Sequence, residues 1–285
     1  MVVRPQADVA AVRTRHPHHF GPASRDRRAA MAVTGAAFLL LVFGLAQLGF
    51  FDSRLLGGLG KLGEVAMLML PPDPGSWSHV RLYISSMIET VAISLLGTLA
   101  AAVLALPLGL LAANNVTTAK VLHFLTRRSL DTIRSVDILV WALIWINVVG
   151  LGPFAGALAI MTSDMGSFGK LFSEAIEAAD HRPVEGIVST GGGRMLGIRF
   201  GILPEVFPVL ASQVLYYFES NTRSATIIGI VGAGGIGLHL AEAIRTLELQ
   251  QASFIILMIL IVVAAIDFGS NRLRFALIGR RGAMA

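Results

Sequence analysis

The segment ESNTRS, residues 219–224, carries polar side chains that are well suited to bind an anion. Glu219 and Arg223 are four residues apart, so on a helix they lie on one face and can form an ion pair. An arginine presents a planar fork of N–H donors that matches the oxygens of phosphate or phosphonate. Two interpretations stay open: a structural ion pair that locks the helix end, or a translocation path or gate formed by Glu219, Asn221 and Arg223.

The next segment, VGAGGIG at residues 231–237, matches the pattern G-x-G-x-x-G. A dinucleotide site also needs a parallel βαβ sheet and an acidic residue about twenty positions further on. Here the following ~30 residues lead into an uncharged membrane span, and no further βαβ unit exists, which makes a membrane-bound NAD oxidoreductase the weaker alternative. We predict instead a glycine-rich break between helices at membrane depth. Gly232, Gly234 and Gly235 are then candidates for the translocation path or gate.

Other chemistry is largely excluded by composition. The chain has no cysteine, so disulfides, thiol catalysis and zinc–thiolate sites are ruled out. It contains no G-x-x-x-x-G-K-[ST] motif, so it does not bind ATP as a P-loop protein does. We therefore predict no catalytic residue, no metal site and no cofactor on this chain, which indicates a protein that is not an enzyme.

The composition indicates an integral membrane protein. Of the 285 residues, 54% are hydrophobic and only 14% are charged, and the mean hydropathy is +0.71. We predict an all-α, polytopic helical bundle with about six transmembrane helices. The expected spans are residues 31–51, 84–113, 136–151, 154 towards 177, a helix that starts near Pro204, and 252–268. Residues 55–70 are expected to form an interfacial helix.

The charges predict the orientation. With both termini in the cytoplasm, 18 of the 23 Lys and Arg fall in inside segments, as the positive-inside rule requires. The five in outside segments are Arg54, Lys61, Arg81, Arg223 and Arg245. The net charge of +5 therefore indicates a lipid bilayer rather than nucleic acid as the partner. The expected domains are a cytoplasmic basic tail at 1–30, a first span with an outer segment at 31–82, a core at 83–275 and a cytoplasmic tail at 276–285.

A polar, glycine-rich and basic segment, EGIVSTGGGRMLGIRFGILP, lies between apolar segments at residues 185–204. It resembles the cytoplasmic loop of ABC importer permeases, whose pattern is E-A-A-x3-G-x9-I-x-L-P. The matching residues are Glu185, Gly191, Leu203 and Pro204. Gly186 and Ile187 replace the two alanines, and Gly201 replaces the isoleucine. In that family the loop, here residues 180–204, forms a short coupling helix that docks on an ATPase, to which Glu185, Arg194 and Arg199 would offer charges.

The wider sequence is similar to the phosphonate ABC transporter permeases (PhnE-type) of the binding-protein-dependent importer family. The resemblance rests on LPLGLLAANN, VGLGPFAGALA, GKLFSEAIEAADHRPVEG and ESNTRSATIIGIVGAGGIGLHLAEAIRT, and it covers about residues 83–275.

The resemblance implies a type I ABC importer permease fold in a bacterial inner membrane. The chain would move phosphonate, phosphate or a related oxyanion inward. Its partners would be a second permease copy in a homodimer, two ATPase subunits that bind ATP and Mg²⁺, and an extracytoplasmic binding protein. The alternative is the same architecture with another solute, such as methionine.

Overall fold

The computed structural model describes residues 25–50 and 53–279, and it divides the chain into two compact units, Met1–Ala66 and Met67–Ala285. The described part of the chain is helical and contains no β-strand. The N-terminal tail and the last residues of the C-terminal tail lie outside the described residues. The first unit contains helix α3 (Arg25–Gln47) and most of α4 (Ser53–Leu68), the predicted interfacial segment, which has 16 residues.

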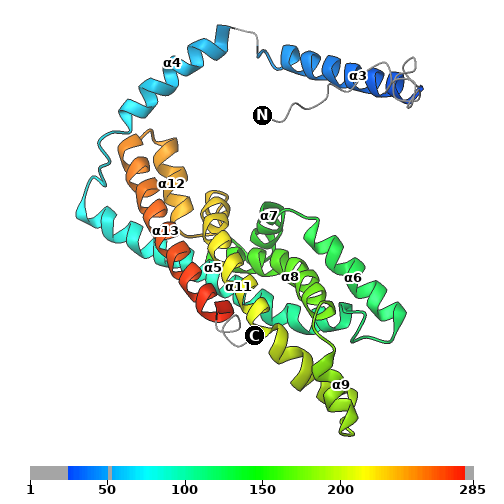
Figure 1. The fold of residues 1–285 in the computed structure, drawn as a ribbon. Helices are drawn as coiled ribbons and strands as arrows, with labels where there is room; N and C mark the ends of the chain where they lie inside the picture. Colours follow the sequence, from blue (N-terminus) through cyan, green and yellow to red (C-terminus); the bar gives the residue numbers. More distant parts are fainter. Residues whose placement is uncertain (1–24, 51–52, 280–285) are drawn as a thin grey trace, which may run out of the picture. The chain divides into compact units, whose positions relative to one another are not determined.

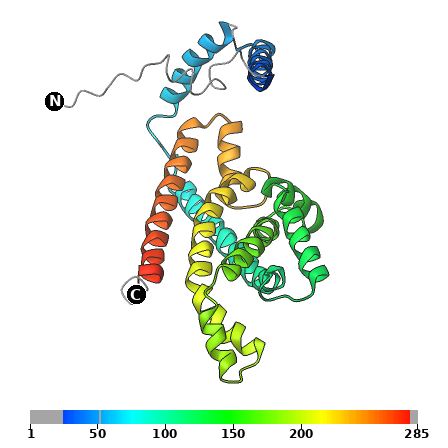
Figure 2. The same ribbon diagram turned by 45° about the vertical axis from the view of Figure 1, so that its right-hand side comes forward.

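The second unit is a bundle of helices that cross at various angles (Figure 1). In chain order its elements are α5 (Trp77–Ala112), α6 (Lys120–Arg134), α7 (Ile138–Val149), α8 (Pro153–Glu177), α9 (Arg182–Ser189), α10 (Arg194–Leu196), the π-helix η1 (Gly197–Ile202), α11 (Leu203–Ile230), α12 (Ile236–Arg245) and α13 (Leu249–Gly279). In both ribbon views α9 projects from one end and α12 lies at the opposite end (Figure 2).

The centre of the bundle is the close contact between α5 and α8. A Cβ on Gly97 of α5 would lie 2.7 Å from Cβ of Ile160 on α8, and one on Gly109 would lie 2.9 Å from Cβ of Phe172. Both positions therefore need glycine, because any side chain would push the helices apart. Phe168, Phe172 and Ile176 of α8 are fully buried in the cluster that also receives α11.

The predicted helical membrane fold is confirmed, but fewer of the described helices qualify as membrane spans than the six predicted. Among the described residues, four helices are long and apolar enough to cross a membrane: Arg28–Gln47, Trp77–Ala112, Arg194–Ile230 and Leu249–Ala276. A fifth span results if α6 and α7, which meet at an angle of 89°, cross together. The third predicted span, 136–151, is therefore only the 12-residue α7 and is too short alone.

The fourth predicted span corresponds to α8, which has 25 residues but is not among the helices apolar enough to pass. It packs against α5, α6, α7 and α11. Since protein covers much of its surface, α8 can carry polar residues such as Asp164 and Ser173 that lipid would not tolerate.

Candidate functional site

The predicted coupling loop begins as a short helix with a defined stop. Helix α9 has Pro183 in its first turn and exposes Glu185. The helix ends at Ser189, and two residues further on Gly191 has a φ of +86°, which suits glycine and is strained for other residues. There the N–H of Gly191 donates to the carbonyl of Val188 at 2.9 Å, and that of Gly192 donates to Ile187 at 3.0 Å. The chain therefore turns sharply at Gly191 and Gly192, directly after α9.

The helix then packs back on the start of the following span. Val184 of α9 lies against Gly197 and Gly201 of η1, and a Cβ on Gly201 would come within 2.9 Å of Cγ2 of Val184. Val184 thus occupies the space that a larger side chain at position 201 would need. Helix α11 begins at Leu203 with Pro204 in its first turn, as predicted.

The loop exposes three large apolar side chains among polar and charged ones. Val188, Met195 and Phe200 are 54%, 78% and 60% exposed, and Arg199 stacks on the ring of Phe200 at 5.3 Å. Val188 lies on α9, while Met195 and Phe200 lie in the first turns of the helix Arg194–Ile230. Exposed apolar side chains at this end of the bundle form a candidate contact surface for another protein.

Arg194 has a different role from the partner contact suggested by its charge. Its Nη2 donates to the carbonyl oxygens of Val116 at 2.6 Å and Asn115 at 3.2 Å, in the connection between α5 and α6. Asn115 in turn donates to the carbonyl of Ile176 on α8 at 2.8 Å. These hydrogen bonds therefore hold the loop against the bundle beside α9.

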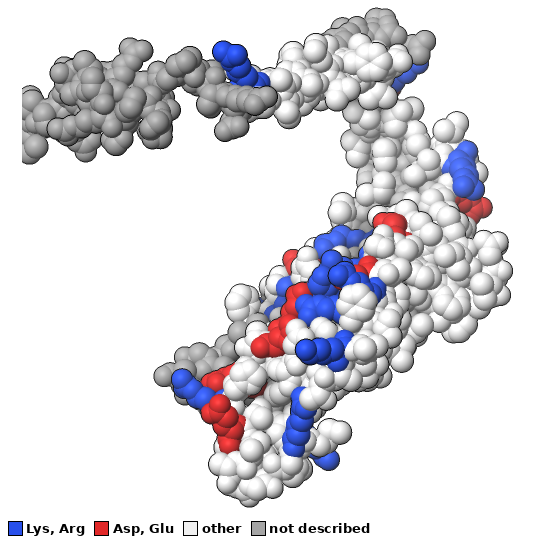
Figure 3. Space-filling model, turned by 90° about the vertical axis from the view of Figure 1, so that its right-hand side faces the viewer, with Lys and Arg blue, Asp and Glu red and all other residues white. Residues whose placement is uncertain are grey.

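Charged side chains gather in a strip on the face that carries α6 (Figure 3).

The predicted ion pair on α11 exists and has a third member. Oε1 of Glu219 accepts from Arg223 at 3.0 Å, and Oε2 accepts from Arg274 of α13 at 3.1 Å. The side chain of Glu219 is only 8% exposed, while those of Arg223 and Arg274 are 52% and 22% exposed. Sequence spacing could not find Arg274, since it lies 55 positions from Glu219.

This cluster places Arg223 within a helix and not in a connection between helices. The charge count put Arg223 in an outer segment and Arg274 inside, but both contact one carboxylate. Arg223 lies within α11, seven residues before its end at Ile230, which is about 10 Å along the axis. Arg223 therefore lies on the exposed face of a helix that can span the membrane, and not in a connection between helices.

Asn221 lies on the other side of α11. It is buried and donates to Asp164 of α8 and to Oγ1 of Thr98 on α5, the latter at 2.8 Å. Beside it, Thr222 and Ser94 of α5 are hydrogen-bonded at 3.2 Å. Asn221 thus joins three helices in the core, whereas Arg223 belongs to a different surface, and the two do not line one space.

The glycine segment is the predicted break between helices. Gly232, Gly234 and Gly235 have φ values of +103°, +82° and +74°, which favour glycine. At the start of α12 the N–H of Gly235 donates to Oε1 of Glu89 at 3.0 Å, and that of Ile236 donates to Oγ1 of Thr90 at 2.8 Å. The donors that a dinucleotide would need are therefore occupied by α5 side chains.

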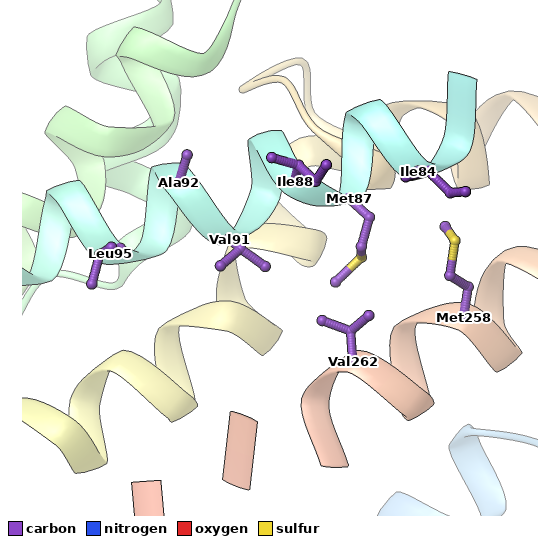
Figure 4. A pocket seen from close by; sticks show the side chains of 8 residues that line it. All are labelled: Ile84, Met87, Ile88, Val91, Ala92, Leu95, Met258 and Val262. Atoms are coloured by element: carbon purple, nitrogen blue, oxygen red, sulfur yellow. The ribbon is translucent and has the colours of Figure 1, made fainter. Parts of the chain in front are cut away.

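The three glycines line a cavity of about 320 Å³ together with Ser86, Glu89 and His239. The carboxylate of Glu89 makes this cavity unfavourable for an anion. Two other grooves are apolar. One of about 460 Å³ lies between α5 and α13, where Met87 and Val91 face Met258 and Val262 (Figure 4). A larger one of about 710 Å³ is lined by α5, α11 and α13, with Phe172 of α8.

Comparison with known proteins places the chain among transport proteins. A family model described as "Binding-protein-dependent transport system inner membrane component" matches residues 105–281. The chain is 37% identical over 256 residues to a putative phosphite transport system permease protein of Stutzerimonas stutzeri, covering 90% of this chain and 89% of that protein. It is 38% identical over 190 residues to a phosphate-import permease protein of Mycolicibacterium smegmatis, covering 67% of this chain and 36% of that protein. It is 50% identical over 117 residues to a putative cryptic phosphonate transport system permease protein of Escherichia coli, covering 41% and 96%.

Solved structures share the fold. An inward-facing form of the MetNI methionine ABC transporter superposes with a TM-score of 0.62 at 19% identity, covering 71% of this chain and 99% of that chain. An amino acid ABC transporter crystallised with histidines gives a TM-score of 0.59 at 17% identity, covering 72% and 95%. At these identities the likeness establishes the fold alone.

Proposed function

Because this chain belongs to the family of binding-protein-dependent transport system inner membrane components, we propose that it is the permease of an ABC importer for phosphonate, phosphate or a related oxyanion such as phosphite. The observation that carries the substrate class is the 37% identity over 90% of the chain with a phosphite transport permease. The methionine transporters share only 19% identity, so they support the fold and not methionine as the substrate.

The driving subunit acts through α9. Two ATPase subunits, with ATP and Mg²⁺ bound, dock on the surface formed by Glu185, Val188, Met195 and Phe200. Closure of the ATPases moves α9, and the packing of Val184 on Gly201 passes that movement to α11. The bonds from Arg194 carry it to the connection between α5 and α6.

The remaining partners act at the opposite end and across the bundle. An extracytoplasmic binding protein delivers the oxyanion near α12, and a second copy of this chain completes the path in a homodimer. The glycine segment at 231–235 is the hinge of the outer gate, because its backbone can change direction without a steric penalty. The protein lies in the bacterial inner membrane with both termini in the cytoplasm.

The test is uptake by the reconstituted complex. The chain, its ATPase and its binding protein are placed in proteoliposomes, and ATP-dependent uptake of labelled phosphite, phosphate and methylphosphonate is compared with that of methionine. Uptake of at least one oxyanion and none of methionine is expected. Uptake of methionine alone would reverse the substrate assignment.

The same preparation tests the docking surface. Glu185→Lys reverses an exposed charge on α9, so the fold should keep its stability, as most surface changes do, while transport per ATP hydrolysed falls about tenfold. Glu174→Lys is the matched control, because Glu174 is also exposed but lies on α8 outside the loop. If both variants transport as the unchanged protein does, α9 is not the docking element.

A further inference from the structure

The face of α11 that carries Arg223 is exposed. Tyr216, Arg223 and Ile227 are all exposed, and their spacing of seven and four residues places them on one stripe of the helix. A charged side chain two turns inside an apolar span faces water or protein rather than lipid. This stripe therefore borders an aqueous path or a partner and does not lie against acyl chains.

The cluster on this face carries an excess positive charge. Two arginines share the single carboxylate of Glu219, and each uses one carboxylate oxygen. The contact of Arg223 with Glu219 uses only Nη2, so other donors of its fork remain for a ligand. Arg274 is more buried, and its guanidinium also lies over the ring of Tyr216 at 5.8 Å. The more accessible cation is Arg223.

The shared carboxylate lets Arg223 change partners. Removing one member of a buried ion pair normally leaves an uncompensated charge, which is costly. Here Glu219 would keep Arg274 if Arg223 moved away. A ligand with its own negative charge can thus replace Glu219 at Arg223 without leaving a buried carboxylate unpaired.

We propose that Arg223 binds the transported oxyanion on the path and that Arg274 is the positioning residue that releases Arg223 by holding Glu219. The exchange replaces a carboxylate by a phosphonate, phosphite or phosphate oxyanion, which the guanidinium fork fits in the same way. The other cavities described above offer no such cation, since they are apolar or carry Glu89. This inference rests on the proposed oxyanion transport.

The experiment uses the complete importer in proteoliposomes, with binding protein saturated with labelled phosphite. Transport turnover and ATP turnover are measured together. Arg223→Gln should lower transport about tenfold or more, the loss expected for a charge-assisted bond, while ATP turnover stays within about twofold. Arg272→Gln is the control, because Arg272 is exposed two positions before Arg274 and lies over Phe268; its transport should not change.

A double substitution separates positioning from structure. Arg274→Gln leaves Glu219 bound to Arg223 alone, so transport should fall; adding Glu219→Gln removes the competing charge and should restore it. A merely structural cluster predicts that the double variant is worse than the single one, and that result overturns the proposal.

Three further outcomes are decisive. If Arg223→Gln does not assemble, Arg223→Lys keeps the charge and loses the fork, and full transport by it contradicts the proposal. If the cluster instead binds a lipid phosphate group, Arg223→Gln leaves the binding of labelled phosphite by the permease–ATPase complex unchanged in phospholipid-free detergent. If the unchanged importer transports no oxyanion, the proposed function is wrong, and this result is distinct from a loss of transport that is seen only in the Arg223 variants.

Discussion

At the scale of single residues, position on the helix decides what each polar group of ESNTRS does. Glu219 and Arg223 share a face and meet Arg274, while Asn221 points into the core towards Asp164 and Thr98. The i, i+4 rule predicted the first contact. Asn221 lies two positions from each of them, so the same geometry turns it to the opposite side of α11.

Asn221→Ala should therefore destabilise the fold. It leaves Asp164 and Thr98 buried without their donor, which costs about 1–3 kcal/mol. The loss is measured as a lower melting temperature of the purified protein in detergent. Asn147→Ala is the control: Asn147 is exposed and bonds only to a carbonyl of its own helix, Leu143, at 2.7 Å. Equal melting temperatures for the two variants would argue against Asn221 as the link between α5, α8 and α11.

At the scale of elements, the loop between α8 and α11 works as one packed piece. Two of its glycines are required for different structural reasons. Gly191 follows α9 with a positive φ, and Gly201 leaves room for the side chain of Val184. The family pattern contains a glycine at the position of Gly191 but not at that of Gly201. A sequence pattern does not show that Val184 would occupy the space of a side chain at position 201.

Gly201→Ala should loosen α9 from η1, since the new Cβ would press on Cγ2 of Val184 at 2.9 Å. Limited trypsin digestion measures this opening as faster cleavage after Arg194 and Arg199. Adding Val184→Ala removes that methyl group and should slow cleavage again, because the two changes act at one contact. If the effects of Gly201→Ala and Val184→Ala on the cleavage rate simply add, the contact between Val184 and Gly201 does not hold α9 against η1.

At the scale of the whole molecule, α9 and α12 lie at opposite ends of the second unit (Figure 1). If the proposed orientation is correct, these ends face opposite sides of the membrane. The chain has no cysteine, so a single introduced cysteine can be mapped without background.

Ser189→Cys on α9 should react with a membrane-impermeant maleimide only after the cells are permeabilised. Ser78→Cys, at the opposite end of α5 from the loop, should react in intact cells. Both positions are exposed, so accessibility to the reagent is matched. Labelling of both from outside would refute the proposed topology, and the reverse pattern would invert it.

The sequence by itself determined the features that depend on local composition and spacing. Long apolar segments without charge predicted a helical membrane bundle, the glycines of 231–237 predicted a break, and the pattern at 185–204 predicted the loop and its family. Each of these signals is contained within a short stretch of chain, so no knowledge of packing was needed.

Only the tertiary structure decided which polar groups meet. Arg274 joins Glu219 from 55 positions away, Asn221 bonds to α5 and α8, and Arg194 binds the connection between α5 and α6. It also showed that α8 needs little apolar surface, since other helices enclose it. These outcomes depend on which helix faces pack together, as where Gly97 and Gly109 bring α5 close to α8, and not on any local pattern.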